Sequence, residues 1–334
     1  MFIRALSALA LLSVFPSNIS AIQQEASHAA GFTRFEPDAT AVYRITSQTP
    51  PPANSDVFVL EAEETIVFDA EGKAVHSRYL LYKILTQKGA EGWANLSCAW
   101  EPWHEERPTL RARVITPDFA VHPLDPATIT DSPDSDDDNA VFSDRRVLRA
   151  PLPAIAAGSL VEEEQSVRET SVFFEAGSVK RTYFGFSAPL RHSRLILDAP
   201  STMSLRYKAE MLADLKPQRT EADGRLRLTF DVGPLEEFDE SDPDLPSDVP
   251  AYPNIVSSTG LSWQSVAERY AQIVDKQIAV DLKPIVGRLI LGKSSRMEKA
   301  SAILQYLSRE IRYTGVEFGD AAIVPRSPTE TLTR

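Results

Sequence analysis

The sequence of 334 residues contains a single cysteine, Cys98, and few histidines. One cysteine excludes an internal disulfide and any cysteine-rich metal site. The histidines are scattered, and no two lie four residues apart as metal-binding pairs on a helix do; they are His28, His76, His104, His122 and His192. We therefore expect no metal site and no cofactor.

The sequence also lacks a tract of basic residues. Its 35 Lys and Arg residues stand against 47 Asp and Glu residues, which gives a net charge of −12. This balance argues against nucleic acid as the main partner. The hydrophobic content of 43% is ordinary for a globular protein and allows a sizeable core. The length suggests about two domains.

After the first residues, no apolar run is long enough to cross a membrane. Residues 1–21 have the pattern of a signal peptide, with Arg4 before an apolar run and small residues at Ser20 and Ala21. The run from Ala5 to Phe15 is short for a bilayer-spanning helix. We therefore predict export to the periplasm or the medium, and no transmembrane segment after signal cleavage.

Residues 22–41 are predicted to be a polar lead-in, and residues 42–235 to be a β-sandwich of antiparallel sheets. Asp69 to Lys73 carries turn residues between two apolar runs and indicates a hairpin. Apolar and polar residues alternate from Leu226 to Val232, as in a half-buried strand. The predicted strands cover 57–68, 74–86, 110–114, 159–168, 172–186, 191–198, 204–209 and 226–232.

The region 236–260 is acidic and rich in proline, and it is predicted to be an exposed linker. Helical spacing begins at Trp263, and a second helix is predicted from Asp281 to Leu291. A third helix begins at Ser295, which forms a capping box with Glu298. The chain is therefore predicted to be mainly β, followed by a helical C-terminal part.

Three local patterns are candidates for a site. Cys98 and His104 could form a thiolate pair, but Cys98 lies in a predicted strand without an activating helix terminus, which favours a structural role. The acidic stretch from Asp131 to Asn139 lacks the Gly and the bidentate Glu of an EF-hand loop, which favours a solvated loop over a calcium site. An aromatic platform for a sugar or peptide stays open beside a core role; its members are Tyr79, Tyr82, Trp93, Trp100 and Trp103.

The C-terminal part resembles the start of a transglutaminase-like (papain-like cysteine) domain. The matching residues are Glu298-Lys299-Ala300, Ile311-Arg312-Tyr313, the loop from Gly315 to Pro325, and Glu330-Thr331-Leu332. The β half is similar, by pattern, to the β-rich domain of unknown function that precedes this core in a bacterial exported family. Residues 261–334 would then be the N-terminal part of the transglutaminase-like domain.

The resemblance implies thiol acyl transfer or amide hydrolysis by a Cys–His–Asp set in a complete protein. The Gly-Asp-Cys motif that carries the nucleophile follows these elements in the family, and this sequence stops just before it. We therefore assign no catalytic residue, and we expect the β domain to bind a substrate or partner. The alternative is a non-catalytic β-sandwich that binds a polypeptide or a glycan. The oligomeric state stays open.

Overall fold

The computed structural model describes residues 35, 38–134, 141–238, 244, 246, 249–260, 262–312 and 315–333. The chain divides into two compact units, at 1–50 and 51–334. In the first unit, helix α2 (Ala39–Ser47) begins at Asp38, whose carboxylate accepts a hydrogen bond from the Ala41 N–H. This helix corrects the prediction, which placed a lead-in and the start of the β half here. The local signal was the N-cap residue alone, because most of the residues that follow it are β-branched or aromatic and have low helix propensity.

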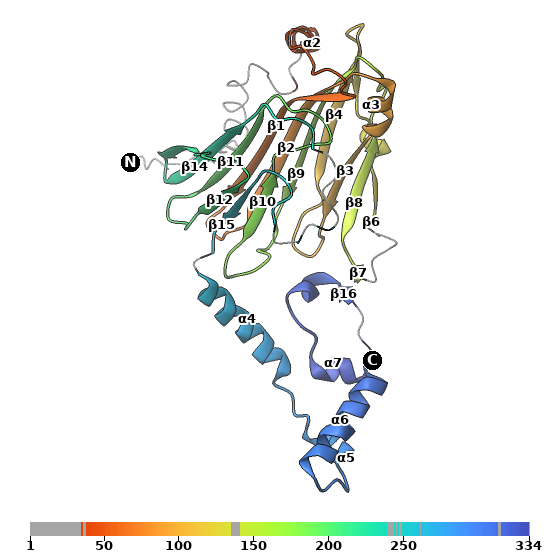
Figure 1. Ribbon diagram of the computed structural model, residues 1–334, viewed down its shortest axis with the longest axis vertical. Coiled ribbons are helices and arrows are strands. Elements are labelled where there is room, and N and C mark those ends of the chain that lie inside the picture. The colour runs from red at the N-terminus through yellow and green to blue at the C-terminus, as the bar shows by residue number, and fades with distance from the viewer. Residues whose placement is uncertain are drawn as a thin grey trace, which may run out of the picture. The chain divides into compact units, whose positions relative to one another are not determined.

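The second unit contains an eight-stranded sheet with the order β13-β14-β11-β1-β2-β9-β4-β5 (Figure 1). From one edge to the other, its strands are β13 (Gln218–Ala222), β14 (Arg225–Val232), β11 (Ser193–Pro200), β1 (Val57–Phe68), β2 (Ala74–Ile84), β9 (Leu160–Arg168), β4 (Thr109–Ile115) and β5 (Val121–Pro123).

Local sequence signals explain the hairpins of this sheet. β1 and β2 pair antiparallel around Asp69, whose side chain accepts hydrogen bonds from the backbone N–H groups of Glu71 and Lys73. Gly72 has φ of 87°, which favours glycine. β14 is buried at every second residue from Leu226 to Val232, as the alternation predicts. The predicted hairpin and strand are confirmed.

One central pairing was not predicted. β1 runs parallel to β11, with Ala62 opposite Ser193 and Val67 opposite Asp198. The sheet is therefore mixed, which corrects the expectation of antiparallel sheets. β11 is buried at seven of its eight residues, and such strands suit the interior of a sheet.

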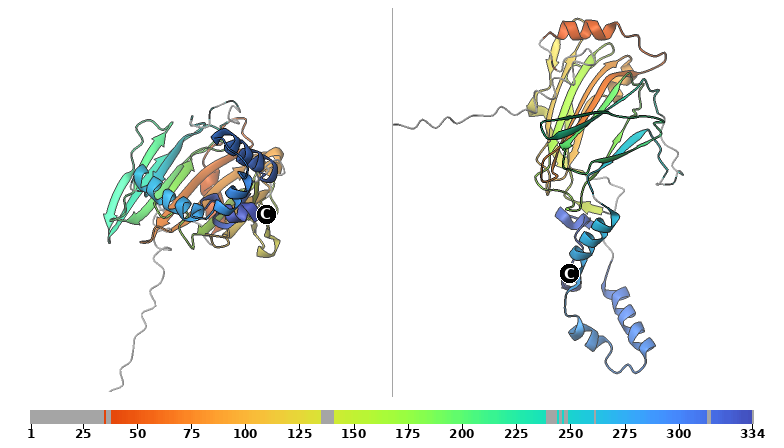
Figure 2. Two further views of the ribbon diagram at one scale, coloured as in Figure 1. Left: turned by 90° about the horizontal axis from the view of Figure 1, so that it is seen from below. Right: turned by 90° about the vertical axis from the view of Figure 1, so that its left-hand side faces the viewer.

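Two three-stranded sheets form a second layer on one face of the large sheet (Figures 1 and 2). One has the order β10-β15-β12 and the other β3-β8-β6. Their strands are β10 (Val179–Tyr183), β15 (Asn254–Ser258), β12 (Arg206–Glu210), β3 (Asn95–Trp100), β8 (Arg146–Pro151) and β6 (Thr130–Pro133).

The strand β15 lies within the range that we predicted to be a linker. It pairs with β10 on one side and with β12 on the other, so it is the central strand of its sheet. The β domain therefore extends to Ser258. β10 is shorter than predicted, because it covers only Val179–Tyr183 of the predicted strand 172–186.

The core consists of two clusters of buried side chains. One gathers around β2 and β9 and includes Tyr82 and Val161, and the other gathers around β11 and β14 and includes Leu197 and Phe230. All four side chains are at most 1% exposed. The second layer contributes to both clusters, because Ala150 of β8 belongs to the first and Ile255 of β15 to the second.

The remaining elements are short or helical. They are α3 (Gln87–Gly92), η1 (Pro126–Thr128), β7 (Val141–Ser143), α4 (Trp263–Ile278), α5 (Lys283–Leu289), α6 (Arg296–Glu310), β16 (Gly315–Glu317), η2 (Gly319–Ala322) and α7 (Pro328–Thr333). The capping box at Ser295 and Glu298 is confirmed at the start of α6. Pro328 is the first residue of α7, where its missing N–H costs nothing. Among the described residues, no helix is both long and apolar enough to cross a membrane.

Candidate functional site

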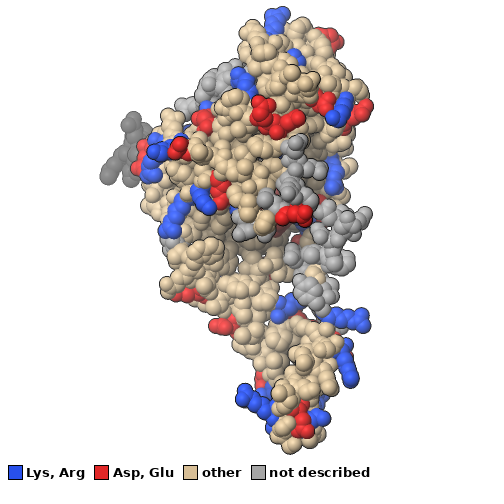
Figure 3. Space-filling view, in the orientation of Figure 1, with Lys and Arg blue, Asp and Glu red and all other residues tan. Residues whose placement is uncertain are grey.

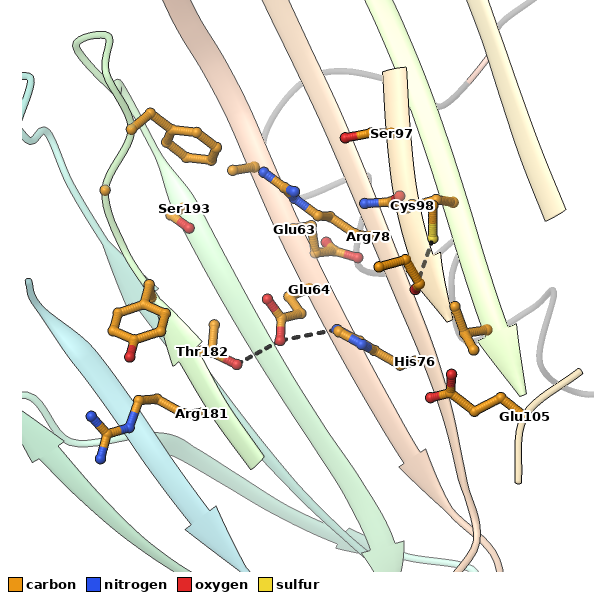
Figure 4. Close-up of a pocket in the computed structure, with 17 residues that line it drawn as sticks. Glu63, Glu64, His76, Arg78, Ser97, Cys98, Glu105, Arg181, Thr182 and Ser193 are labelled. Atoms are coloured by element: carbon orange, nitrogen blue, oxygen red, sulfur yellow. Dashed lines mark hydrogen bonds and ion pairs between the residues drawn. The ribbon is translucent and has the colours of Figure 1, made fainter. Parts of the chain in front are cut away.

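A cavity of about 470 Å³ lies between the large sheet and the second layer (Figure 4). Its floor comes from β1, β2, β9 and β11, and its two rims come from β3 and from β10 with the residues that follow β10. Most of the lining residues are polar, and the charged or titratable ones are Glu63, Glu64, His76, Arg78, Cys98, Glu105, Arg181 and Tyr183.

Strand pairing brings the floor residues together. Glu64 of β1 lies opposite Arg78 of β2, and Arg78 lies opposite Gln165 of β9. Residues two apart on one strand point to the same face of a sheet, so His76 joins Arg78 on the cavity side. The local sequence does not reveal this arrangement, because the three strands are joined only through their register.

Glu64 is the centre of a hydrogen-bonded group (Figure 4). Its carboxylate accepts a hydrogen bond from the Thr182 hydroxyl at 2.6 Å and lies 3.0 Å from Nε2 of His76. Burial alone would raise the pKa of Glu64, but the bonds from His76 and Thr182 and the charge of Arg78 outweigh it, so the pKa is lowered. Glu64 is therefore an ionised and satisfied group that also ties β1 to β10.

Arg78 is the cation of the cavity floor. Its guanidinium carbon lies 5.5 Å from the centre of the Phe186 ring, a cation–π arrangement. Within the described part of the chain, its guanidinium makes no hydrogen bond and no ion pair. The charge of Arg78 lowers the pKa of nearby Glu64, and it opposes the burial that raises the pKa of Glu163. Arg78 can therefore receive an anionic or hydrogen-bond-accepting group from a ligand.

Cys98 also lines the cavity, but its thiol is not activated. Burial, reinforced by the negative charge of Glu105, raises the pKa of Cys98 to about 11. Its thiol donates a long hydrogen bond to the Ala99 carbonyl, at 3.8 Å. His104 pairs instead with Glu101, at 3.3 Å. The geometry therefore agrees with the structural role that the sequence favours for Cys98.

A family model described as a domain of unknown function with a solved structure (DUF3857) matches residues 70–238, just over half of the chain. The chain belongs to this family. The match spans the β1–β2 turn, β2, β9 and β10, and hence most of the cavity lining. No curated protein matches the chain.

Two solved structures are similar to this member of the DUF3857 family. One, described as a "putative protease" from Parabacteroides distasonis, has a TM-score of 0.63 at 12% identity, over 84% of this chain and 55% of that chain. The other, an M1 zinc metallopeptidase from Deinococcus radiodurans, has a TM-score of 0.33 at 11% identity, over 62% of this chain and 43% of that chain. The first likeness shows the fold alone, and the second carries no argument. The chain thus spans little more than half of the first structure's length.

The opposite face of the large sheet in this DUF3857 domain carries paired charges. Glu162 of β9 is fully buried and accepts hydrogen bonds from Nε of Arg113 at 2.7 Å and from the Tyr79 hydroxyl at 2.9 Å. The imidazole of His192 lies between Glu61 and Asp231, 2.9 Å from each. These pairs link neighbouring strands across the sheet.

The structure separates the other sequence candidates. Trp93 packs against Tyr82 with ring centres 4.8 Å apart, whereas Trp103 packs against Phe173 at 5.5 Å. Tyr79 points to the face opposite Tyr82, because it carries the bond to Glu162. The tryptophans and tyrosines therefore belong to several packing groups, and they do not assemble into one platform.

The acidic stretch from Asp131 to Asn139 is described only at its start. Asp131 pairs with Arg107 at 3.2 Å and with Arg146 at 2.7 Å, and Asp134 pairs with Arg145 at 3.1 Å. The residues from 135 to 139 lie outside the described part. On the face drawn in Figure 3, acidic and basic side chains are interspersed rather than gathered by sign.

The ion pairs of His192 with Glu61 and Asp231 predict that the stability of the folded protein depends on pH. Hydrogen bonds to Asp231 and then to Glu61, opposed by burial, raise the pKa of His192 to about 9. An unfolded histidine titrates near 6.5. The ion pairs of protonated His192 therefore stabilise the folded state fully below about pH 6.5, and this stabilisation is lost as the pH rises through about 9.

The His192 side chain is 25% exposed and that of Asp231 is 45% exposed, so solvent screening reduces the effect to about 1–2 kcal/mol. We expect the free energy of unfolding, measured by urea denaturation from pH 6 to 10, to fall by this amount. The decrease should be absent in His192→Gln. An unchanged decrease in that variant would assign the pH dependence to other groups.

Proposed function

We propose that this chain is the N-terminal part of an exported protein, and that its DUF3857 domain binds a polypeptide. A transglutaminase-like domain, begun by the helices from α4 onward, would act on that polypeptide by thiol acyl transfer or amide hydrolysis. The residue pattern from Glu298 to Leu332 supports this assignment, as does the capping box that starts α6. The similarity in fold to a structure described as a "putative protease" is compatible with it.

The observation that carries the proposal is the cavity around Arg78. It is polar, it holds a cation without an ion pair among the described residues, and its cysteine has a raised pKa. Such a site offers binding contacts but no activated thiol. The chemistry is therefore assigned to the domain that follows, and recognition is assigned to this one.

A polypeptide suits the cavity better than a glycan does. Sugars bind proteins largely by stacking on exposed aromatic faces, but the guanidinium of Arg78 already lies 5.5 Å from the Phe186 ring centre. A carboxylate or a backbone carbonyl of a polypeptide can instead bond to the guanidinium. The second aromatic ring of the lining, Tyr183 on the β10 rim, likewise has the guanidinium of Arg181 5.9 Å from its centre, so a sugar would compete with a cation at either ring.

The proposal predicts that Arg78→Ala weakens polypeptide binding. The probe is fluorescently labelled α-lactalbumin, kept unfolded by reduction and carboxymethylation, and binding is followed by fluorescence anisotropy. An acidic probe avoids non-specific attraction to a chain with net charge −12. A hydrogen bond to a charged group contributes about 1.5–3 kcal/mol, so the affinity should fall about tenfold or more.

The matched control is Arg219→Ala. Arg219 is exposed and lies on β13, at the edge of the large sheet, away from the cavity lining. We expect this variant to bind the probe as the unmodified chain does. Equal affinity of Arg78→Ala and Arg219→Ala would show that the cavity does not hold the polypeptide.

A further inference from the structure

β3 is an edge strand whose free side borders the cavity. Its register with β8 pairs Leu96 with Ala150 and Cys98 with Leu148. The same register continues to Ala94 and Leu152, where the Leu152 N–H donates to the Ala94 carbonyl at 2.8 Å. In an antiparallel pair, bonded and non-bonded residues alternate. Leu96 and Cys98 therefore bond to β8, and the N–H groups of Ser97 and Ala99 point away from it.

β10 is an edge strand with the same property. It pairs with β15, and its register places Lys180 opposite Ser257 and Thr182 opposite Ile255. Two backbone bonds outside the strand continue this register, from Phe184 N–H to Pro253 O at 2.8 Å and from Thr259 N–H to Ser178 O at 3.0 Å. By the same alternation, Lys180 and Thr182 bond to β15. Arg181 and Tyr183 direct their N–H and C=O groups to the free side.

Both free sides face the same cavity. Ser97, Cys98 and Ala99 form one rim, and Arg181, Thr182 and Tyr183 form the other (Figure 4). The second layer thus has a gap between β3 and β10, above the floor of β1 and β2. On both sides of this gap lie backbone N–H and C=O groups that pair with no other strand in the described part of the chain. Unpaired edges of this kind are templates for another strand.

We propose that an extended segment of a partner polypeptide inserts between β3 and β10 as an added strand. Its backbone would bond to the outward groups of one or both rims. This proposal rests on the polypeptide binding proposed above and adds its geometry. The insertion also distinguishes a polypeptide from other ligands. The outward N–H and C=O groups of each rim repeat every second residue, at about 6.6–6.8 Å, and only another extended backbone carries hydrogen-bonding groups with this spacing.

The residues of the cavity floor determine which side chain of the added strand fits when it points toward the large sheet. Alternate side chains of the added strand point toward the large sheet. Glu64 is satisfied by His76 and Thr182, whereas Arg78 has no ion pair among the described residues. The fitting segment therefore carries Asp or Glu at an inward position and no proline where its backbone bonds to the rims.

Amide hydrogen exchange, read residue by residue by NMR, tests the insertion with the unfolded α-lactalbumin probe. With the probe bound, exchange at Ser97, Ala99, Arg181 and Tyr183 should slow by about tenfold or more on at least one rim. The alternate residues Cys98 and Thr182 should change little, because they are already bonded. Arg219 and Glu221 of β13 serve as the control edge and should not change.

The control edge is chosen on the same grounds. Asp223 and Gly224 have φ of 51° and 72° and form a two-residue turn that joins β13 to β14. Such a turn is closed by a bonded pair, here Ala222 and Arg225. By alternation, Arg219 and Glu221 point outward at this edge, which lies away from the cavity.

A matched pair of variants gives a second measurement. Ala99→Pro removes an outward N–H without breaking the bonds between β3 and β8, and Glu221→Pro does the same on β13. Ala99→Pro should weaken binding of the probe about tenfold, and Glu221→Pro should not. Circular dichroism of both variants is the check that they fold.

The outcomes separate the two proposals. Binding of the probe without protection at either rim would overturn the insertion and leave polypeptide binding standing. Failure of the probe to bind would overturn both. Slow amide exchange at both rims in the absence of the probe, together with a dimer in light scattering, would show that a second copy of the chain occupies the gap. That result would overturn the proposal of a partner polypeptide.

Discussion

Iodoacetamide is expected to alkylate Cys98 about a hundredfold more slowly in the folded chain than in the chain unfolded by urea. The thiolate is the reactive form, and burial, with the charge of Glu105, raises the pKa of Cys98 to about 11. Two pKa units reduce the thiolate fraction at neutral pH about a hundredfold. The side chain is also only 8% exposed, which further restricts access.

The measurement is the alkylation rate by mass spectrometry from pH 7 to 11, with the folded state checked at each pH. The folded chain should titrate well above the free-thiol value of about 8.5. Glu105→Gln should accelerate alkylation, because it removes the charge that opposes the thiolate. Rapid alkylation at neutral pH, with a fitted pKa below 8.5, would make Cys98 a candidate nucleophile and would contradict a purely binding role.

Arg113→Met is expected to lower the free energy of unfolding by about 3–5 kcal/mol, the usual cost of removing one member of a buried ion pair. Glu162 is fully buried, and Nε of Arg113 lies 2.7 Å from its carboxylate. The substitution leaves the carboxylate with its bond from the Tyr79 hydroxyl but without this cation.

The double variant Arg113→Met/Glu162→Leu is the control. Replacing both members of a buried pair by apolar side chains of similar size is often neutral, so much of the lost stability should return. Urea denaturation of the four proteins, with the single Glu162→Leu included, gives the coupling between the two residues. A loss below 1 kcal/mol in Arg113→Met would show that the pair is solvated in the folded protein.

Several elements could be predicted from the sequence because their signals are local. The turn at Asp69 and Gly72 defined the β1–β2 hairpin, alternation defined β14, and the capping box at Ser295 defined the start of α6. The mainly β class with C-terminal helices is likewise confirmed. In each case the residues that decide the element are neighbours in the chain.

The parallel pairing of β1 with β11 could not be predicted. The two strands lie more than 120 residues apart, and nothing in either strand specifies its partner's direction. β15 was missed for a different reason. It is five residues long and follows an acidic, proline-rich stretch, whose composition dominated the interpretation of the whole range.

The candidate site could not be predicted from local sequence patterns either. Glu64, His76 and Thr182 come from three strands and meet only when β2 pairs with β1 and β10 packs above them. Cys98 attracted attention in the sequence because it is the single cysteine. Arg78 did not, because one arginine within a strand has no distinguishing pattern before its neighbours are known.

The most direct test of polypeptide recognition compares two ligands in one calorimetric titration series. The chain is titrated with unfolded, carboxymethylated α-lactalbumin and, separately, with peptidoglycan strands freed of their stem peptides. We predict saturable binding of the polypeptide, weakened by Arg78→Ala, and no binding of the glycan. Saturable binding of the glycan strands, with none of the polypeptide, would contradict the account.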